Sequence, residues 1–172
     1  MKNLLLTVLI TLSTTIFAKT PDSLFGVSIN DNVLNYVTKE ELKSKDKDVV
    51  SGYFWLLLKN PPVINKDYSD VLFVTFDKNN KISEIQSEKN FQNSENCETV
   101  EYGIRRTLET KYDIKFTKSS LSRYGFYHWV GYGDIVIGTE CKFVGDDETT
   151  LFIYIQTEEY SYKYDEYFNS RI

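Results

Sequence analysis

Apolar residues in this sequence follow two spacings, one of two residues and one of three to four residues. Successive side chains of a β-strand point to opposite faces, whereas residues three and four apart share one face of a helix. The first spacing therefore predicts strands, and the second predicts helices.

Six segments have the pattern of strands. The first is dense in aromatic and branched side chains and ends at Asn60-Pro61-Pro62, which continues neither a strand nor a helix. Periodicity alone leaves a buried helix open for that segment. The next two segments flank the turn of residues 77–81, and together they predict a β-hairpin. The predicted strands cover residues 49–58, 70–76, 81–87, 125–132, 135–144 and 150–157.

The clearest helical pattern covers residues 94–112. Asn93 or Ser94 can cap its start, and the acids of its first turn suit the positive end of the helix dipole. One apolar stripe follows the helical spacing and consists of Cys97, Val100, Ile104, Leu108 and Tyr112. We therefore expect this helix to lie against a sheet.

Together these elements predict an α+β fold. We expect residues 19–172 to form one globular domain, because 154 residues can bury a proper core. Its antiparallel sheet would have four to six strands, with one main helix of about residues 94–112 packed on one face. A small helical segment is predicted near the N-terminus. The tail of residues 158–172 begins with a strand spacing and ends with a helical one, so both assignments stay open.

The first eighteen residues have the layout of a cleavable signal peptide. Lys2 precedes an apolar stretch of residues 4–17, and Ala18 provides a small residue at the cleavage site. The stretch is shorter than the roughly 20 apolar residues of a membrane span. We therefore expect an exported protein, periplasmic or secreted, whose mature chain begins at about Lys19 and keeps no membrane anchor. No Asn-x-Ser/Thr acceptor occurs, which favours a bacterial periplasm.

The chain contains two cysteines, Cys97 and Cys141. In an exported protein an even number of cysteines indicates a disulfide bond. Cys97 lies on the apolar stripe of the predicted helix, and Cys141 shares a strand face with Ile135, Ile137 and Phe143. We therefore expect a disulfide that fastens the helix across the sheet.

Charge and motifs exclude several classes of function. Without Lys2 the chain has 19 basic and 25 acidic residues, a net charge of −6, which disfavours nucleic acid and anionic membranes as partners. No nucleophile elbow, zinc motif, phosphate-binding loop or dinucleotide fingerprint occurs. His128 is the single histidine and is interpreted as an ordinary residue of a sheet face. No catalytic residue, metal or cofactor is therefore predicted.

Tyrosine is the one feature beyond ordinary composition, with 13 in the chain. Aromatic side chains with a polar tip are common in binding surfaces. The candidate binding residues are Tyr124, Phe126, Tyr127, Trp129 and Tyr132. Strands are enriched in aromatic residues in any case, so ordinary core packing is the competing interpretation.

The sequence thus predicts a non-enzymatic binding or accessory module for an unknown protein or small ligand. A hydrolase with unidentified acidic catalytic residues and a structural envelope protein are the two alternatives.

Overall fold

A computed structural model describes residues 21–63, 66–67, 69–121, 125–143 and 148–171 of the chain. The predicted signal peptide, residues 1–18, and Lys19 lie outside these residues. The main element is an eight-stranded sheet in which all hydrogen-bonded neighbours are antiparallel. Its strands, in spatial order, are β3 (Asp46–Lys47), β4 (Tyr53–Leu57), β5 (Val71–Asp77), β6 (Ile82–Phe91), β10 (Thr149–Thr157), β9 (Ile135–Phe143), β8 (Gly125–Tyr132) and β7 (Thr117–Leu121).

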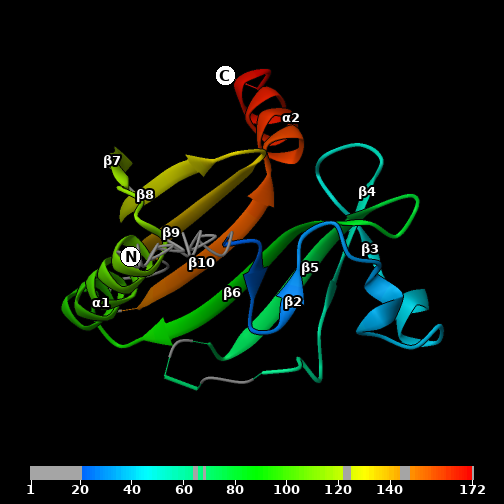
Figure 1. Cartoon of the computed structure of the whole chain (residues 1–172), viewed down its shortest axis with the longest axis horizontal. Helices are drawn as coiled ribbons and strands as arrows, with labels where there is room; N and C mark the ends of the chain where they lie inside the picture. The colour runs from blue at the N-terminus through cyan, green and yellow to red at the C-terminus, as the bar shows by residue number, and fades with distance from the viewer. Residues whose placement is uncertain (1–20, 64–65, 68, 122–124, 144–147, 172) are drawn as a thin grey trace, which may run out of the picture.

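Smaller elements complete the described fold (Figure 1). A two-stranded sheet near the N-terminus pairs β1 (Ser23–Leu24) with β2 (Val27–Ser28), and two 3-10 helices follow, η1 (Val33–Asn35) and η2 (Glu41–Ser44). The two α-helices are α1 (Ser94–Tyr112) and α2 (Glu158–Asn169). Helix α1 begins where the Asn93 side chain accepts a hydrogen bond from the Asn96 amide, and it ends at Asp113, which has a left-handed backbone.

The predicted sheet of four to six strands with one main helix is wrong. The described fold is mostly sheet, with eight strands in one sheet, two more in a second, and two α-helices. The strands absent from the prediction are the two edges, of which β3 has two residues and β7 has the mostly polar sequence Thr-Lys-Ser-Ser-Leu. Neither edge shows the alternation of apolar residues on which the prediction depended. The unassigned tail forms α2.

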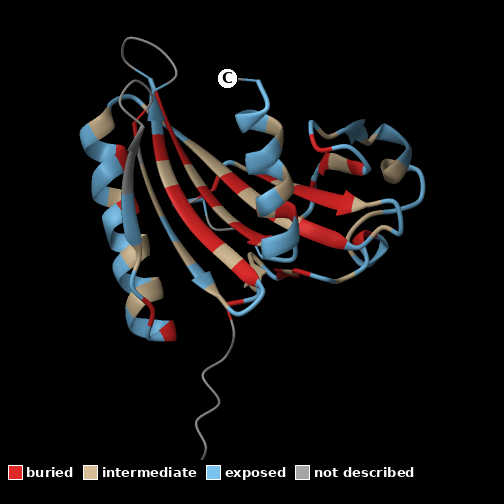
Figure 2. Ribbon diagram, turned by 90° about the horizontal axis from the view of Figure 1, so that it is seen from above, coloured by how far each residue is buried: buried red, intermediate tan, exposed pale blue. Residues whose placement is uncertain are grey.

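The neighbouring strands β9 and β10 divide their side chains between the two faces of the sheet. On β9 the residues Ile135, Ile137, Thr139 and Cys141 are buried on one face, and on β10 Leu151, Ile153 and Ile155 join them. The intervening residues point to the opposite face. Figure 2 shows the buried core of the sheet between α1 on one side and α2 on the other.

Helix α1 packs on the apolar face, against β9, β10 and β6. Its predicted stripe is part of this contact, because Cys97, Val100 and Ile104 pack in one buried cluster, and Leu108 and Tyr112 pack in the main core. The predicted disulfide between Cys97 and Cys141 is confirmed, with 6.1 Å between the two Cα atoms. The bond therefore fastens the first turn of α1 to β9, two residues before that strand ends.

A buried carboxylate adds a polar connection between α1 and the sheet. Glu101 is 5% exposed, and its Oε1 accepts hydrogen bonds from Thr139 Oγ1 at 2.6 Å and from Arg105 Nε at 3.2 Å. His128 Nδ1 lies 2.9 Å from the same oxygen, although outside hydrogen-bond alignment. Breaking such a buried set of partners is strongly destabilising, so this cluster fixes the position of α1.

Helix α2 follows β10 without a connecting loop. The Thr157 hydroxyl accepts a hydrogen bond from the Tyr160 amide at 3.2 Å and caps the helix. Tyr160 is 1% exposed, its ring lies 5.1 Å from that of Tyr53, and its hydroxyl donates to Asp48 at 3.1 Å. Tyr160 is thus the anchor that holds the N-terminal turn of α2 on the sheet.

We expect the substitution Cys141→Ser to reduce the free energy of unfolding by about 2–5 kcal/mol, because the open chain gains the entropy of a long loop. Urea denaturation of the oxidised protein measures this change. Cys97→Ser and reduced wild-type protein should give losses of the same size. Equal stability of oxidised and reduced wild-type protein would show that the bond is absent or contributes nothing.

Candidate functional site

The face of the sheet opposite α1 contains a cavity of 490 Å³ beside α2, here called the α2 groove. Its floor comes from β6, β8, β9 and β10, and α2 forms one wall. The lining residues mix aromatic rings with polar and charged groups, and they are Glu84, Gln86, Tyr127, Trp129, Val136, Glu140, Lys142, Phe152, Tyr154, Gln156, Ser161, Tyr164 and Asp165. A neighbouring cavity of 320 Å³ shares Glu84, Gln86 and Tyr164 with the α2 groove.

Strand register explains why these residues meet. Glu140 on β9 lies opposite Tyr127 on β8 and Phe152 on β10, so one acid has an aromatic neighbour on each side. Directly opposed side chains of an antiparallel pair are about 4.5–5.5 Å apart at Cβ. The α2 groove is therefore built from cross-strand neighbours on one face of the sheet.

Gly138 makes room for the ring of Tyr154. It lies opposite Trp129 on β8 and Tyr154 on β10. A Cβ atom at Gly138 would overlap the ring carbons and hydroxyl of Tyr154. The absence of a side chain on the middle strand therefore lets the tyrosine ring lie across the floor of the groove.

Three polar groups of the α2 groove have no hydrogen-bond or ion-pair partner among the described residues. Gln156 is 9% exposed and is the most buried residue of the three. The Tyr154 hydroxyl and the Glu140 carboxylate also lack such a partner. Buried polar groups in proteins are nearly always hydrogen-bonded, to the protein, to water or to a ligand. The groove thus presents unused donors and acceptors.

Burial raises the pKa values of the acids and phenols of this face. The pKa of Glu84 is raised to about 7, mainly by burial and against the hydrogen bond from Thr75 Oγ1 at 2.9 Å. Burial also raises the pKa of Glu140, and the charge of Lys142 opposes that shift. The pKa of Tyr164 is raised to about 12 by burial, with Glu84 adding to it. Negative charge is therefore disfavoured here.

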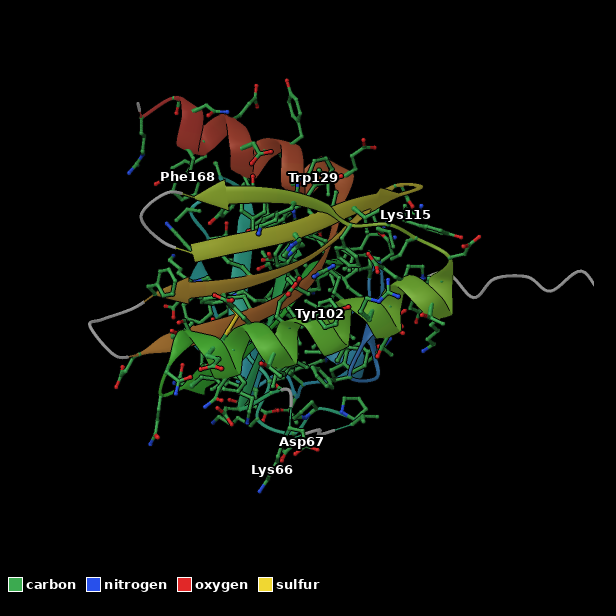
Figure 3. All side chains as sticks on the ribbon, turned by 90° about the vertical axis from the view of Figure 1, so that its left-hand side faces the viewer. Lys66, Asp67, Tyr102, Lys115, Trp129 and Phe168 are labelled. Carbon is green, nitrogen blue, oxygen red and sulfur yellow. A yellow bond between two sulfur atoms is a disulfide. The ribbon has the colours of Figure 1, made fainter. Side chains whose placement is uncertain are left out.

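The five predicted binding residues divide into three groups. Tyr127 and Trp129 line the α2 groove, and Figure 3 shows Trp129 on the side of the sheet that carries α2, away from Tyr102 on α1. Tyr132 packs against the main core instead. Tyr124 and the side chain of Phe126 lie outside the described part of the chain. A single surface formed by all five residues therefore stays a prediction.

The candidate binding residues predicted from the sequence do not include the polar residues of the groove, among them Glu84, Glu140 and Gln156. Each occupies a polar position within an alternating strand, and that pattern ordinarily marks a solvent-facing residue. The sequence does contain one indication of the groove. The polar positions of residues 81–87 and 135–144 belong to strands whose neighbours carry large aromatic residues. Only the register shows that they converge.

His128 belongs to the opposite face, in the cluster around Glu101 described above. Burial lowers its pKa, and the charge of Glu101 acts against this shift. A cavity of 550 Å³ adjoins the cluster and is lined by Glu98, Glu101, Tyr102, Arg105, Phe116, Lys118, His128 and Cys141. Because Glu101 is already held by Thr139 and Arg105, the cluster acts to join α1 to the sheet.

Comparisons with family models, with curated proteins and with solved structures find no match for this chain. Neither described α-helix is long and apolar enough to cross a membrane. Within the described residues, no group of three or more His, Cys, Asp or Glu side chains could hold a metal ion. The geometry of the α2 groove is therefore the basis for its proposed chemistry.

We expect Glu84→Gln to stabilise the protein at high pH. The ordinary pKa of this group is 4.5 and its folded value is about 7, so folding favours the protonated form. Wild-type protein has this stability below pH 4.5 and loses it as the pH rises through 7. The variant should therefore gain about 1–3 kcal/mol over wild type at pH 8.5 and little at pH 4.5.

Thermal or urea unfolding across this pH range measures the difference. Glu98→Gln is the matched control, because it removes one acid from the exposed surface of α1. A gain for Glu84→Gln that does not change with pH would show that the carboxyl titrates normally.

Proposed function

We propose that this chain is a non-enzymatic binding module that holds its ligand in the α2 groove. The observation that carries the proposal is Gln156, a residue 9% exposed whose side-chain amide has no hydrogen-bond partner among the described residues and lies on the floor of an open cavity. The amide is accessible from the cavity, so it can exchange hydrogen bonds with a ligand held there.

The size and lining of the groove support a small ligand or a short segment of a protein. Its volume of 490 Å³ lies within the usual range of ligand pockets, about 300–1,000 Å³. Aromatic surfaces with a few placed polar groups are typical of such pockets. Trp129 is 39% exposed and offers a large ring at little entropic cost, since its side chain has only two rotors.

The spacing of the acids favours binding over a hydrolase with paired carboxylates. Glu84 on β6 lies opposite Gln156 on β10, which in turn lies opposite Val136, four residues before Glu140. In a regular sheet this offset separates the Cα atoms of Glu84 and Glu140 by roughly 16 Å. Glycosidases need carboxyl groups about 5–9.5 Å apart, so Glu84 and Glu140 would have to reach towards each other across Tyr154 to act as a pair. Tyr154 lies between the two acids, so they act as separate contacts.

We also propose that the module acts outside the cytoplasm, in a bacterial periplasm or as a secreted protein. The layout of residues 1–18 supports export, and the disulfide between Cys97 and Cys141 is compatible with an oxidising compartment.

Expression with the native leader in a bacterium should release a periplasmic protein whose chain starts within two residues of Lys19. Intact-mass analysis of the osmotic-shock fraction measures the start. A protein that keeps residues 1–18 and sediments with membranes would contradict export with cleavage.

Small probes should bind in the α2 groove and depend on Trp129. We expect a panel of amines, oligosaccharides and tripeptides to shift the amide NMR signals of β8, β9 and β10, and Trp129→Ala to weaken the bound probe about 5-fold or more. Gly138→Ala should also weaken binding, because it displaces the Tyr154 ring.

Two variants serve as controls for this experiment. Gly131→Ala adds the same methyl group on the adjacent strand, where no atom lies within 4 Å of the new Cβ. Tyr102→Ala removes a ring that is 56% exposed on the α1 side. Both should bind like wild type. Shifts that are spread over the surface, or that survive Trp129→Ala, would show that the groove is not the binding site.

A further inference from the structure

The α2 groove carries more negative than positive groups. Glu84, Glu140 and Asp165 line it together with the cation Lys142, and Glu84 is only partly ionised near neutral pH because its pKa is about 7. Lys142 is exposed, and its Nζ lies over the ring of Phe152, 6.0 Å from the ring centroid. Among the described residues no ion pair joins these carboxylates to a cation, although the charge of Lys142 acts on Glu140.

Aromatic rings surround these carboxylates. Glu140 has Tyr127 and Phe152 as direct cross-strand neighbours, and Trp129 follows two residues after Tyr127 on the same face. The face of an aromatic ring attracts a cation, and the attraction grows when water is excluded. A carboxylate beside aromatic rings is thus a composite binding site for positive charge.

Tyr154 connects the two ends of this arrangement. Its ring lies across Gly138, and both Glu140 and Glu84 act electrostatically on its hydroxyl. The hydroxyl and the amide of Gln156 have no described partner and can accept hydrogen bonds from a donor in the groove. An ammonium group supplies such donors, whereas an anion would meet the acids Glu140 and Asp165.

We propose that the ligand of the α2 groove is an organic cation, an ammonium head group on an aromatic or aliphatic frame. This inference rests on the proposed binding function and names the chemistry of its ligand. The head group pairs with Glu140 and is faced by Tyr127 and Trp129. The frame lies along Phe152 and Tyr154. A neutral ligand such as an oligosaccharide would leave the carboxylate of Glu140 unpaired.

Three probes of similar size and different charge test the proposal. They are 2-phenylethylamine, 2-phenylethanol and phenylacetate, measured by NMR titration at pH 7.5 with the full mature chain. We expect the amine to bind about tenfold or more tightly than the alcohol, because a charge-assisted bond is stronger than a neutral one. Phenylacetate should bind most weakly. Raising the salt concentration should weaken the binding of the amine and leave the binding of the alcohol unchanged.

Glu140→Gln should lower the affinity for the amine about tenfold and leave that for the alcohol within about twofold. Glu98→Gln is the matched control, since it removes the same charge from the exposed surface of α1. An equal loss in both variants would show that only net charge matters, and it would overturn the proposal. Because the variant removes an unpaired carboxylate, it should fold, and its unfolding temperature confirms this.

Two further outcomes separate this inference from the proposed function. If 2-phenylethanol or chitotriose binds in the groove at least as tightly as the amine, the cation proposal is overturned and the binding function stands. If none of the probes, chitotriose included, shifts the signals of the groove residues, the groove itself is not a binding site.

Discussion

Helix α1 is held on the sheet by a covalent bond and by a buried carboxylate, and these contacts determine which face of the sheet is closed. The disulfide joins the first turn of the helix to Cys141. One turn further along the helix, the carboxylate of Glu101 accepts hydrogen bonds from Thr139 and Arg105. An eight-stranded sheet has two faces, and α1 closes only one of them. The other face receives the shorter α2, anchored by Tyr160, and the uncovered area beside this helix is the groove.

Local patterns were sufficient to predict those contacts within one element. The range of α1 follows from its stripe and its Asn93 cap, and the disulfide follows because Cys97 and Cys141 each lie on the apolar side of their element. The size of the sheet was not predictable in this way. The edge strand β7 is held in the sheet by backbone hydrogen bonds to β8. Backbone hydrogen bonds do not require a particular pattern of side chains, so the sequence pattern does not reveal such a strand.

The groove depended on information that no single segment contains. Tyr127 and Trp129 were predicted because aromatic residues with a polar tip are common in binding surfaces. Gln156 and Glu84 belong to different strands, and each has the pattern of an ordinary exposed residue. Their convergence is set by the pairing of β6, β10 and β9, in which Glu84 lies opposite Gln156. Gly138 is informative only once Tyr154 is known to lie across it.

The alternation along β9 and β10 also separates the positions that form the core from the positions that line the groove. Odd-numbered residues from Ile135 to Cys141 hold the core, while the even-numbered Gly138 and Glu140 face the groove, and β10 repeats this division. Substitutions at even positions therefore alter the lining of the groove and leave the core residues under α1 unchanged. Under the binding function proposed above, single mutations at these positions would change the specificity of the groove without changing the core.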